Sequence, residues 1–268
     1  MMRKPTWREV VASSGVTLAA FAVFLVVLAP STLLDAGLRH ATGGRLRLAQ
    51  AQGTLWSGSG QLELVNAAVP GAVGKDLSWA LQPSSLWRGR LDFDVIMDHA
   101  TSRFPLHISA RGIELTNVNF DLPASALAIA VPRIAPLGPR GDLVFQINRY
   151  SSVSGKVIAD ATVTWKDASS ALTAVAPLGT YKLRIDGGGG VVNAKLSTSS
   201  GPLRLDGSGS SRGFGPLSLA VTARVAAQQR AQLAPLLRLI AIERGNGDFA
   251  LQFSPPLGNA PVAPPQHP

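Results

Sequence analysis

The chain of 268 residues contains no cysteine, which excludes a disulfide framework and a thiolate metal site. A periplasmic or secreted domain of this size can build its core without disulfides, so this absence does not decide the compartment. Charged residues make up only 15% of the chain and aromatic residues 6%, whereas 46% are hydrophobic. This composition is apolar for a soluble protein and too polar for a protein with several membrane spans.

Acidic residues are fewer than basic ones, and the formal net charge is +9. The cations are mostly arginines that stand singly between apolar residues, as in Leu183-Arg184-Ile185 and Leu203-Arg204-Leu205. A nucleic-acid-binding protein usually concentrates its basic residues on one helix or stripe and adds stacking aromatics. The scattered pattern favours the solvated face of a sheet, and no nucleic-acid partner is expected.

One long uncharged segment runs from residue 10 to residue 34, with its densest apolar part at residues 16–29. At about 1.5 Å per residue, a helix of this length crosses the roughly 30 Å hydrocarbon layer of a bilayer. A cleaved signal peptide is the alternative, because basic residues precede the segment. No A-x-A cleavage site follows Ala29, and the run is long for a signal peptide, so we expect an uncleaved anchor.

Basic residues flank this anchor on both sides, so its orientation is inferred from the lengths of the two flanking segments more than from their charge. A short charged tail, residues 1–9, tends to stay in the cytoplasm, and long following domains cross the membrane largely regardless of charge. We therefore expect a single-pass protein of the inner membrane, with residues 40–253 in the periplasm. The last segment, residues 254–268, is rich in proline and is predicted to be disordered.

Beyond residue 40 the apolar residues alternate with polar ones, which is typical of half-buried strands. The clearest alternation covers residues 91–97, 157–165, 181–185 and 217–225. A longer helix is predicted at Ala226–Gly245, with Pro235 at a kink or in its first turn, and a short one near Pro83–Trp87. The predicted fold is mainly β: one N-terminal transmembrane helix, then a curved, mostly antiparallel sheet of about ten strands with one C-terminal helix. A closed barrel, a sandwich and an open groove all fit this pattern.

Glycine-rich stretches suggest turns more than phosphate loops. The segment GTLWSGSG, Gly53 to Gly60, lacks the lysine of a phosphate loop and continues into a strand pattern, as does Gly187–Gly190. Both are predicted to be hairpin turns or bulges. Before the segment Gly53 to Gly60, Leu46-Arg47-Leu48 leads into glycine and serine, and Leu203-Arg204-Leu205 leads into a similar Gly/Ser stretch at residues 203–219. The recurrence indicates a second hairpin of the same kind. Further turns are expected at Asp186-Gly187, Gly201-Pro202, Asp206-Gly207 and Gly215-Pro216.

No catalytic, cofactor-binding or metal-binding residue can be assigned from the sequence. The G-x-S-x-G match at residues 209–213 lies in a predicted Gly/Ser turn without the strand-to-helix context of a nucleophile elbow. Asp92, Asp94, Asp98 and His99 form the nearest approach to a metal cluster, but they are predicted to lie on the wet face of an edge strand. His40 and His107 have no charged companion at a useful spacing. We therefore expect no enzymatic activity.

Taken in order, several motifs resemble those of the type II secretion system protein N family. They are an N-terminal anchor, GTLWSGSG at Gly53 to Gly60, LSWALQPSSLWRGRL at Leu77 to Leu91, Leu122-Pro-Ala124, Gly141-Asp-Leu143, and GPLRLDG at Gly201 to Gly207. The resemblance continues to about Phe253. It implies an inner-membrane protein of the general secretion pathway, without catalytic residues, that assists the export of folded proteins across the outer membrane.

This resemblance implies other type II secretion components as partners, besides the lipid bilayer. The pattern is also similar to that of AsmA-like proteins, whose long curved sheets form a groove that accommodates lipid, and this leaves a lipid carrier between membranes as the alternative. Trp56, Trp79 and Trp87 look like recurrent aromatic positions of the family and are expected to pack in the core or line a groove.

Overall fold

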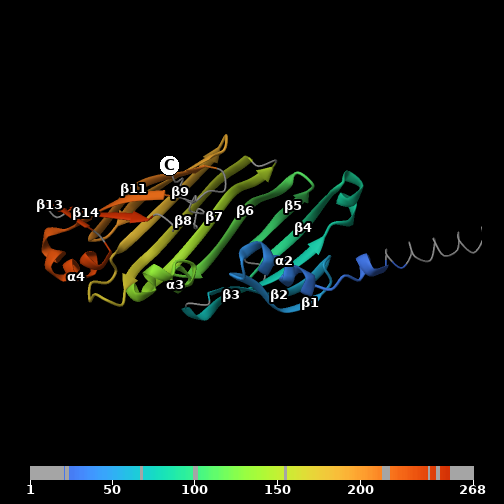
Figure 1. Cartoon of the computed structure of the whole chain (residues 1–268), viewed down its shortest axis with the longest axis horizontal. Coiled ribbons are helices and arrows are strands. Elements are labelled where there is room, and N and C mark those ends of the chain that lie inside the picture. Colours follow the sequence, from blue (N-terminus) through green and yellow to red (C-terminus); the bar gives the residue numbers. More distant parts are fainter. Residues whose placement is uncertain are drawn as a thin grey trace, which may run out of the picture.

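The computed structural model describes residue 21 and residues 24–66, 69–98, 102–153, 156–212, 218–240, 242–245 and 248–253. They form one sheet of fourteen antiparallel strands, shown in Figure 1, in the order β1-β2-β3-β4-β5-β6-β7-β8-β9-β10-β11-β12-β14-β13. The bounds of its first seven strands are β1 Leu46–Gly53, β2 Ser57–Asn66, β3 Val69–Leu81, β4 Arg90–Met97, β5 Ser102–Ser109, β6 Gly112–Pro123 and β7 Pro139–Val153. The others are β8 Lys156–Ser170, β9 Gly179–Gly188, β10 Val191–Ser200, β11 Leu203–Arg212, β12 Ser218–Val225, β13 Ile242–Gly245 and β14 Asp248–Phe253.

The helices occupy the ends of the chain and the longer connections. They are α2 (Thr32–Thr42), η1 (Pro83–Arg88), α3 (Ser125–Ala130), η2 (Pro132–Leu137), η3 (Ala227–Gln229) and α4 (Arg230–Ile240). The predicted C-terminal helix is present as η3 and α4, but it ends at Ile240, and the next described residues form strand β13. Pro235 lies inside α4, not in its first turn. The short helix expected near residue 83 is the 3-10 helix η1.

The sheet is open, because β1 and β13 are its two outermost strands. It is also strongly curved: α3 packs against β2, β3 and β7, although four strands separate β2 from β7 in the sheet. The register shifts within the β1–β2, β7–β8 and β8–β9 pairs, where Gln50 and Asp167 adopt positive φ angles. Such bulges bend a strand and increase its twist, which accounts for part of the curvature.

The turn predictions are partly correct. Gly201-Pro202 separates β10 from β11, and Gly189-Gly190, with φ angles of 63° and 90°, forms a two-residue hairpin between β9 and β10. Asp186-Gly187 and Asp206-Gly207 instead lie within β9 and β11. The two consecutive glycines can both adopt the left-handed conformation that a tight hairpin requires, so the turn forms there. Gly215-Pro216 lies outside the described residues.

In the segment Gly53 to Gly60, the turn is formed by Thr54-Leu55-Trp56, and Gly58 and Gly60 belong to strand β2. The segment therefore has the predicted strand-turn-strand arrangement, with two of its glycines in the strand. The recurrence at residues 203–219 corresponds to β11 and β12, which pair as antiparallel neighbours. Its glycines and serines up to Arg212 lie in β11, although a turn was predicted there.

The predicted membrane anchor, residues 10–34, falls mostly outside the described residues, as do the tails at residues 1–9 and 254–268. Within the part of the chain that is described, no helix is both long enough and apolar enough to cross a bilayer. Thr32 and the residues after it belong to α2, and Pro30 forms a bridge with Thr54. The end of the predicted anchor is thus attached to the sheet.

Two hydrophobic clusters hold the sheet together. The first lies under α2 and joins β1 to β7; its buried members are Leu48, Trp79, Phe93, Val95, Met97, Phe104 and Val118. The second joins α4 to β11, β12 and β14, and includes Leu203, Val221, Ala223, Leu233, Leu236, Leu237 and Phe249. Trp79 is buried and Trp56 packs against the first cluster, as expected. Trp87 is 94% exposed, so the prediction that it packs inside is wrong.

Candidate functional site

Apolar side chains continue along one face of the sheet from the first hydrophobic cluster, which includes Val118, to the second. The register aligns Phe120, Phe145, Val163, Leu183 and Leu196 in one row across β6 to β10. A second row, parallel to the first, consists of Val118, Ile147, Ala161, Ile185 and Ala194. With strands about 4.8 Å apart, each row spans about 19 Å. We call these ten residues the apolar trough.

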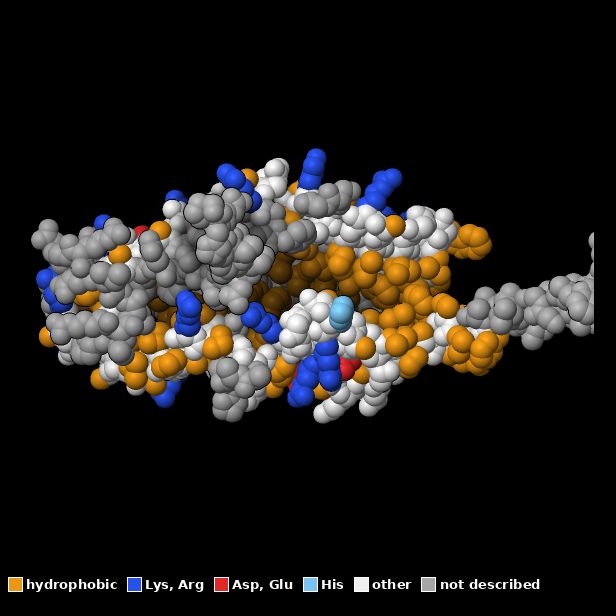
Figure 2. Space-filling model, viewed as in Figure 1, with side chains coloured by type: hydrophobic (Ala, Val, Ile, Leu, Met, Phe, Trp, Pro, Cys, Tyr) orange, Lys and Arg blue, Asp and Glu red, His pale blue; other side chains and the backbone are white. Residues whose placement is uncertain are grey.

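The apolar trough is only partly filled by its own side chains. All five residues of its first row are half-buried, whereas the two ends of the sheet have fully buried residues beneath α2 and α4. Phe120 and Phe145 stack with ring centroids 4.6 Å apart and nearly parallel planes. Figure 2 shows hydrophobic side chains gathered in a hollow along the middle of the molecule. A contiguous apolar surface of this kind is typical of a binding surface for an apolar ligand or partner.

The opposite face of the same strands is polar. A row of Asn119, Gln146, Thr162, Arg184 and Lys195 runs across β6 to β10 on that side. Arg184 pairs with Asp186 at 2.9 Å, and this hydrogen bond raises the pKa of its guanidinium. The two-sided pattern confirms the prediction of one apolar and one polar sheet face. Arg184 and Lys195, two of the scattered basic residues, lie on the polar face.

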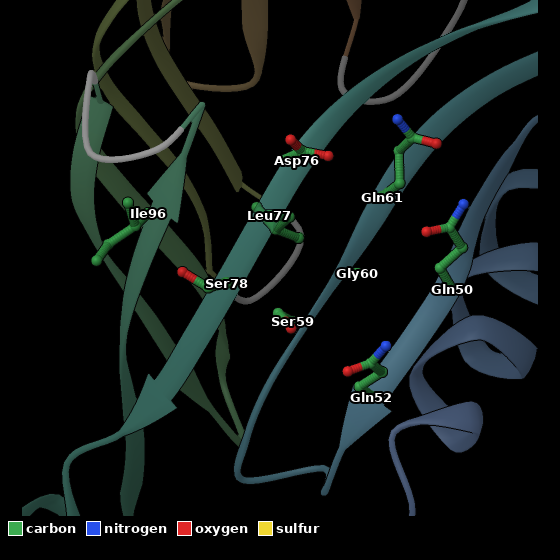
Figure 3. Close-up of a pocket in the computed structure, with 9 residues that line it drawn as sticks. All are labelled: Gln50, Gln52, Ser59, Gly60, Gln61, Asp76, Leu77, Ser78 and Ile96. Atoms are coloured by element: carbon green, nitrogen blue, oxygen red, sulfur yellow. The ribbon is translucent and has the colours of Figure 1, made fainter.

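A shallow polar hollow of about 300 Å³ lies on the outer side of β1 to β4 (Figure 3). Amide, hydroxyl and carboxylate groups line it, namely Gln50, Gln52, Ser59, Gln61, Asp76 and Ser78. These groups can donate and accept hydrogen bonds, but they include no histidine, lysine or thiol that would activate a nucleophile. The hollow therefore has the chemistry of a contact surface.

Asp92, one of the candidate metal ligands, lies in a different environment from the one predicted. Strand β4 lies between β3 and β5, so it is not an edge strand, and Asp92 is only 4% exposed. Its carboxylate accepts hydrogen bonds from Arg90 at 2.9 Å and from His107 at 2.8 Å. His107 therefore does have a charged companion, which the sequence spacing failed to indicate because the pair forms across two strands.

The other candidates do not gather around Asp92. Asp94 accepts a hydrogen bond from Gln82, Asp98 pairs with Lys75, and His99 lies outside the described residues. In the described part of the chain, no group of three or more acidic or histidine side chains is arranged to hold a metal ion. His40 is exposed at the end of α2.

Ser85 lies beside Asp92 but does not complete a catalytic arrangement. Its hydroxyl donates to the carbonyl of Gln82 at 2.7 Å and accepts from the backbone N–H of Asp92 at 3.1 Å. A serine nucleophile needs a hydrogen bond to its general base, and this hydroxyl is committed to backbone groups. Ser211, of the G-x-S-x-G match, lies within strand β11 and not at a strand-to-helix turn.

The free edge of strand β1 is sealed by helix α2. The N–H of Leu46 donates to the hydroxyl of Thr42 at 3.1 Å, and the N–H of Leu48 donates to Asp35 at 2.8 Å. At the other end of the sheet, β13 pairs only with Asp248 to Ala250 of β14. Leu251 to Phe253 thus have a strand partner on one side only, among the residues described. A partner strand can add there, but not at β1.

Comparison with known proteins identifies one family. The sequence profile of type II secretion system (T2SS) protein N matches residues 44–252. The match begins just before β1 and ends within β14, so it takes in the whole sheet, including the apolar trough. Comparisons with curated proteins and with solved structures give no significant match. An open antiparallel sheet with one apolar face and no catalytic cluster among its described residues is therefore the structure of a chain that belongs to the type II secretion system protein N family.

Proposed function

We propose that this protein is a non-enzymatic accessory subunit of the type II secretion machinery that assists the export of folded proteins across the outer membrane. The observation that carries this proposal is the family match over residues 44–252, which coincides with the complete sheet. The chemistry of the described residues agrees with it, because the polar hollow and the Asp92 pair offer contacts and structural support instead of a reactive group.

In this proposal the apolar segment at residues 10–34 anchors the protein in the inner membrane, and the sheet lies in the periplasm. The described end of that segment supports it, because Phe24, Leu25, Val26, Val27 and Leu28 are all more than half exposed. A run of exposed apolar side chains is unfavourable in water and favourable in lipid. Alkaline phosphatase fused after Gln252 should be active. Release of the unfused protein by osmotic shock would contradict the anchor.

Other secretion components would be contacted through the C-terminal edge of the sheet. Strand β1 is sealed by α2, whereas Leu251 to Phe253 of β14 have no strand partner on one side among the described residues and so could accept an added strand. Backbone hydrogen bonds supply the affinity in such complexes. Leu251 pairs with Val221 of β12, so its neighbour Gln252 directs its backbone N–H toward the open edge, and replacing Gln252 with proline removes that donor. We expect this variant to lose cross-linking to secretion components, whereas Gln252→Ala keeps the backbone donor and should retain it.

Deletion of the gene tests the secretion role directly. We expect less export of secreted hydrolases, with folded cargo accumulating in the periplasm, and restoration of export by the full-length chain. Unchanged export together with a leaky outer membrane would contradict the secretion role and favour the second candidate.

The second candidate is a lipid carrier, and the half-buried apolar trough is the observation that favours it. Stoichiometric phospholipid should then co-purify with the full-length protein and be detected by mass spectrometry. Leu183→Gln, in the middle of the trough, should reduce the bound lipid. Its neighbour Lys182 faces the other side of the sheet, so Lys182→Gln should leave the lipid unchanged. Protein that is free of lipid would exclude the carrier.

A further inference from the structure

Two loops of the sheet lie at the end where the N-terminal segment is attached. In an antiparallel meander, every second connection lies at the same end of the sheet. The β1–β2 turn, Thr54 to Trp56, and the β3–β4 connection with η1 are both of this set. A backbone hydrogen bond from Leu81 to the carbonyl of Trp56, 2.7 Å long, joins the two loops.

The N-terminal segment is held against the same end. The indole N–H of Trp56 donates to the carbonyl of Val26 at 2.8 Å, and the N–H of Leu55 donates to the carbonyl of Ala29 at 2.7 Å. The apolar residues Phe24 to Leu28 therefore leave the domain beside these loops, with their side chains exposed. Figure 1 shows the chain departing from this end, beyond β1 and β4.

Helix η1 presents its apolar side chains outward. Trp87 is 94% exposed and Leu86 is 51% exposed, although Leu and Trp are the most apolar residues of the loop. The loop itself is well fixed: Ser85 is buried, Pro83 begins the helix, and the N–H of Gly89 donates to the carbonyl of Leu86 at 3.0 Å. An ordered turn thus holds Trp87 in its exposed position.

Basic side chains accompany these apolar ones. Arg88 is exposed and follows Trp87 directly, and Arg111 is exposed in the β5–β6 turn, which belongs to the same end of the sheet. Tryptophan and arginine together suit the membrane–water interface, where the indole lies at the headgroup level and the guanidinium meets lipid phosphates.

We propose that this end of the sheet rests on the surface of the bilayer that the N-terminal segment enters. Trp87 and Leu86 insert among the lipid headgroups, and Arg88 and Arg111 contact anionic lipid phosphates. The inference rests on the membrane anchoring proposed above, but not on the secretion role. It gives the domain a second point of attachment, which fixes its orientation relative to the bilayer.

The absence of cysteine makes a direct test possible, because a single introduced cysteine is the only labelling site. Leu86→Cys and Leu172→Cys are each introduced into the full-length chain and labelled with nitrobenzoxadiazole. Leu172 is 46% exposed and lies in the β8–β9 connection, at the opposite end of the sheet, so it is a matched control. Both proteins are reconstituted in nanodiscs of phosphatidylethanolamine and phosphatidylglycerol that contain a headgroup-labelled nitroxide lipid.

We expect blue-shifted emission and several-fold stronger nitroxide quenching at position 86 than at position 172. Adding Trp87→Ser to the labelled Leu86→Cys chain should weaken the quenching, and Trp87→Tyr should retain most of it. Equal, water-like emission at both positions in loaded discs would overturn the inference and assign Trp87 to a protein contact. Failure of the protein to remain with the discs would instead contradict the anchor, and with it this inference.

Discussion

The carboxylate of Asp35 in α2 accepts a hydrogen bond from the backbone N–H of Leu48 in β1, with a donor–acceptor distance of 2.8 Å. A side chain thus takes the place that a neighbouring strand would occupy at an open edge. Asp35 also pairs with Arg39 at 2.8 Å, one turn later in α2. The Asp35 carboxylate therefore makes an ion pair within α2 and also satisfies a backbone donor at the edge of β1.

Asp35→Ala should destabilise the protein by about 1–3 kcal/mol, because it leaves the N–H of Leu48 without its acceptor. It should also promote association of the exposed strands, which size-exclusion chromatography would detect. Arg39→Ala removes only the exposed ion pair and should cost less than about 1 kcal/mol in chemical denaturation. Equal losses in the two variants would show that the edge contact is unimportant.

Gly58 is required for the packing of Trp79. A Cβ atom at Gly58 would collide with the carbonyl of Gln52 and would lie 2.7 Å from the Trp79 ring, whose indole N–H donates to the carbonyls of Thr54 and Leu55 at 3.2 Å. We expect Gly58→Ala to cost about 2–3 kcal/mol through overpacking. Gly188→Ala, with no atom within 4 Å of its Cβ, should be close to neutral. Thermal unfolding of both variants provides the comparison.

Leucines in the buried core and in the apolar trough should respond differently to truncation. Leu143 is 2% exposed, so Leu143→Ala should cost about 3 kcal/mol through lost burial and a residual cavity. Leu183 is half-buried in the trough, and Leu183→Ala should cost about 1 kcal/mol, because part of its surface already meets solvent. Urea denaturation measures both. Similar costs would mean that the trough is packed like the core.

Lys75 should contribute stability that is lost in alkali. Burial lowers the pKa of its amine, but the hydrogen bond to Asp98 and the nearby charge of Asp121 outweigh this and raise the pKa above the ordinary 10.5. A raised pKa in the folded state means that the contribution is complete below 10.5 and disappears as the pH rises through the folded value. The unfolding temperature of the native chain should therefore fall more steeply in this range than that of Lys75→Met. The exposed Lys195→Met serves as the control, and it should keep the native pH profile.

Periodicity predicted the strands in which apolar and polar side chains alternate, such as β4, β8, β9 and β12. It underestimated their number, because β2 and β11 contain glycine and serine where an alternating strand would have larger side chains. Helix α2 was not recognised, since its first residues continue the apolar run before it. Helix α3 is only six residues long, too short to establish a helical period.

The features of the candidate site that sequence reasoning missed depend on contacts between distant residues. Asp92 and His107 meet only because β4 and β5 pair in one particular register. The apolar trough likewise requires five strands to align their apolar residues, which no single segment specifies. Trp87 was predicted to be packed, as tryptophan usually is, but the short helix η1 directs it away from the sheet.

The strand order of the sheet follows the order of the chain from β1 to β12. Each strand therefore pairs first with the one made just before it, and the entropy lost in closing each connection is small. A chain that emerges N-terminus first can add its strands one at a time onto an existing template, without waiting for its C-terminus. The last strands are the exception: β14 lies between β12 and β13, and its Phe249 belongs to the second hydrophobic cluster, so that cluster is complete only once the final strand has been made.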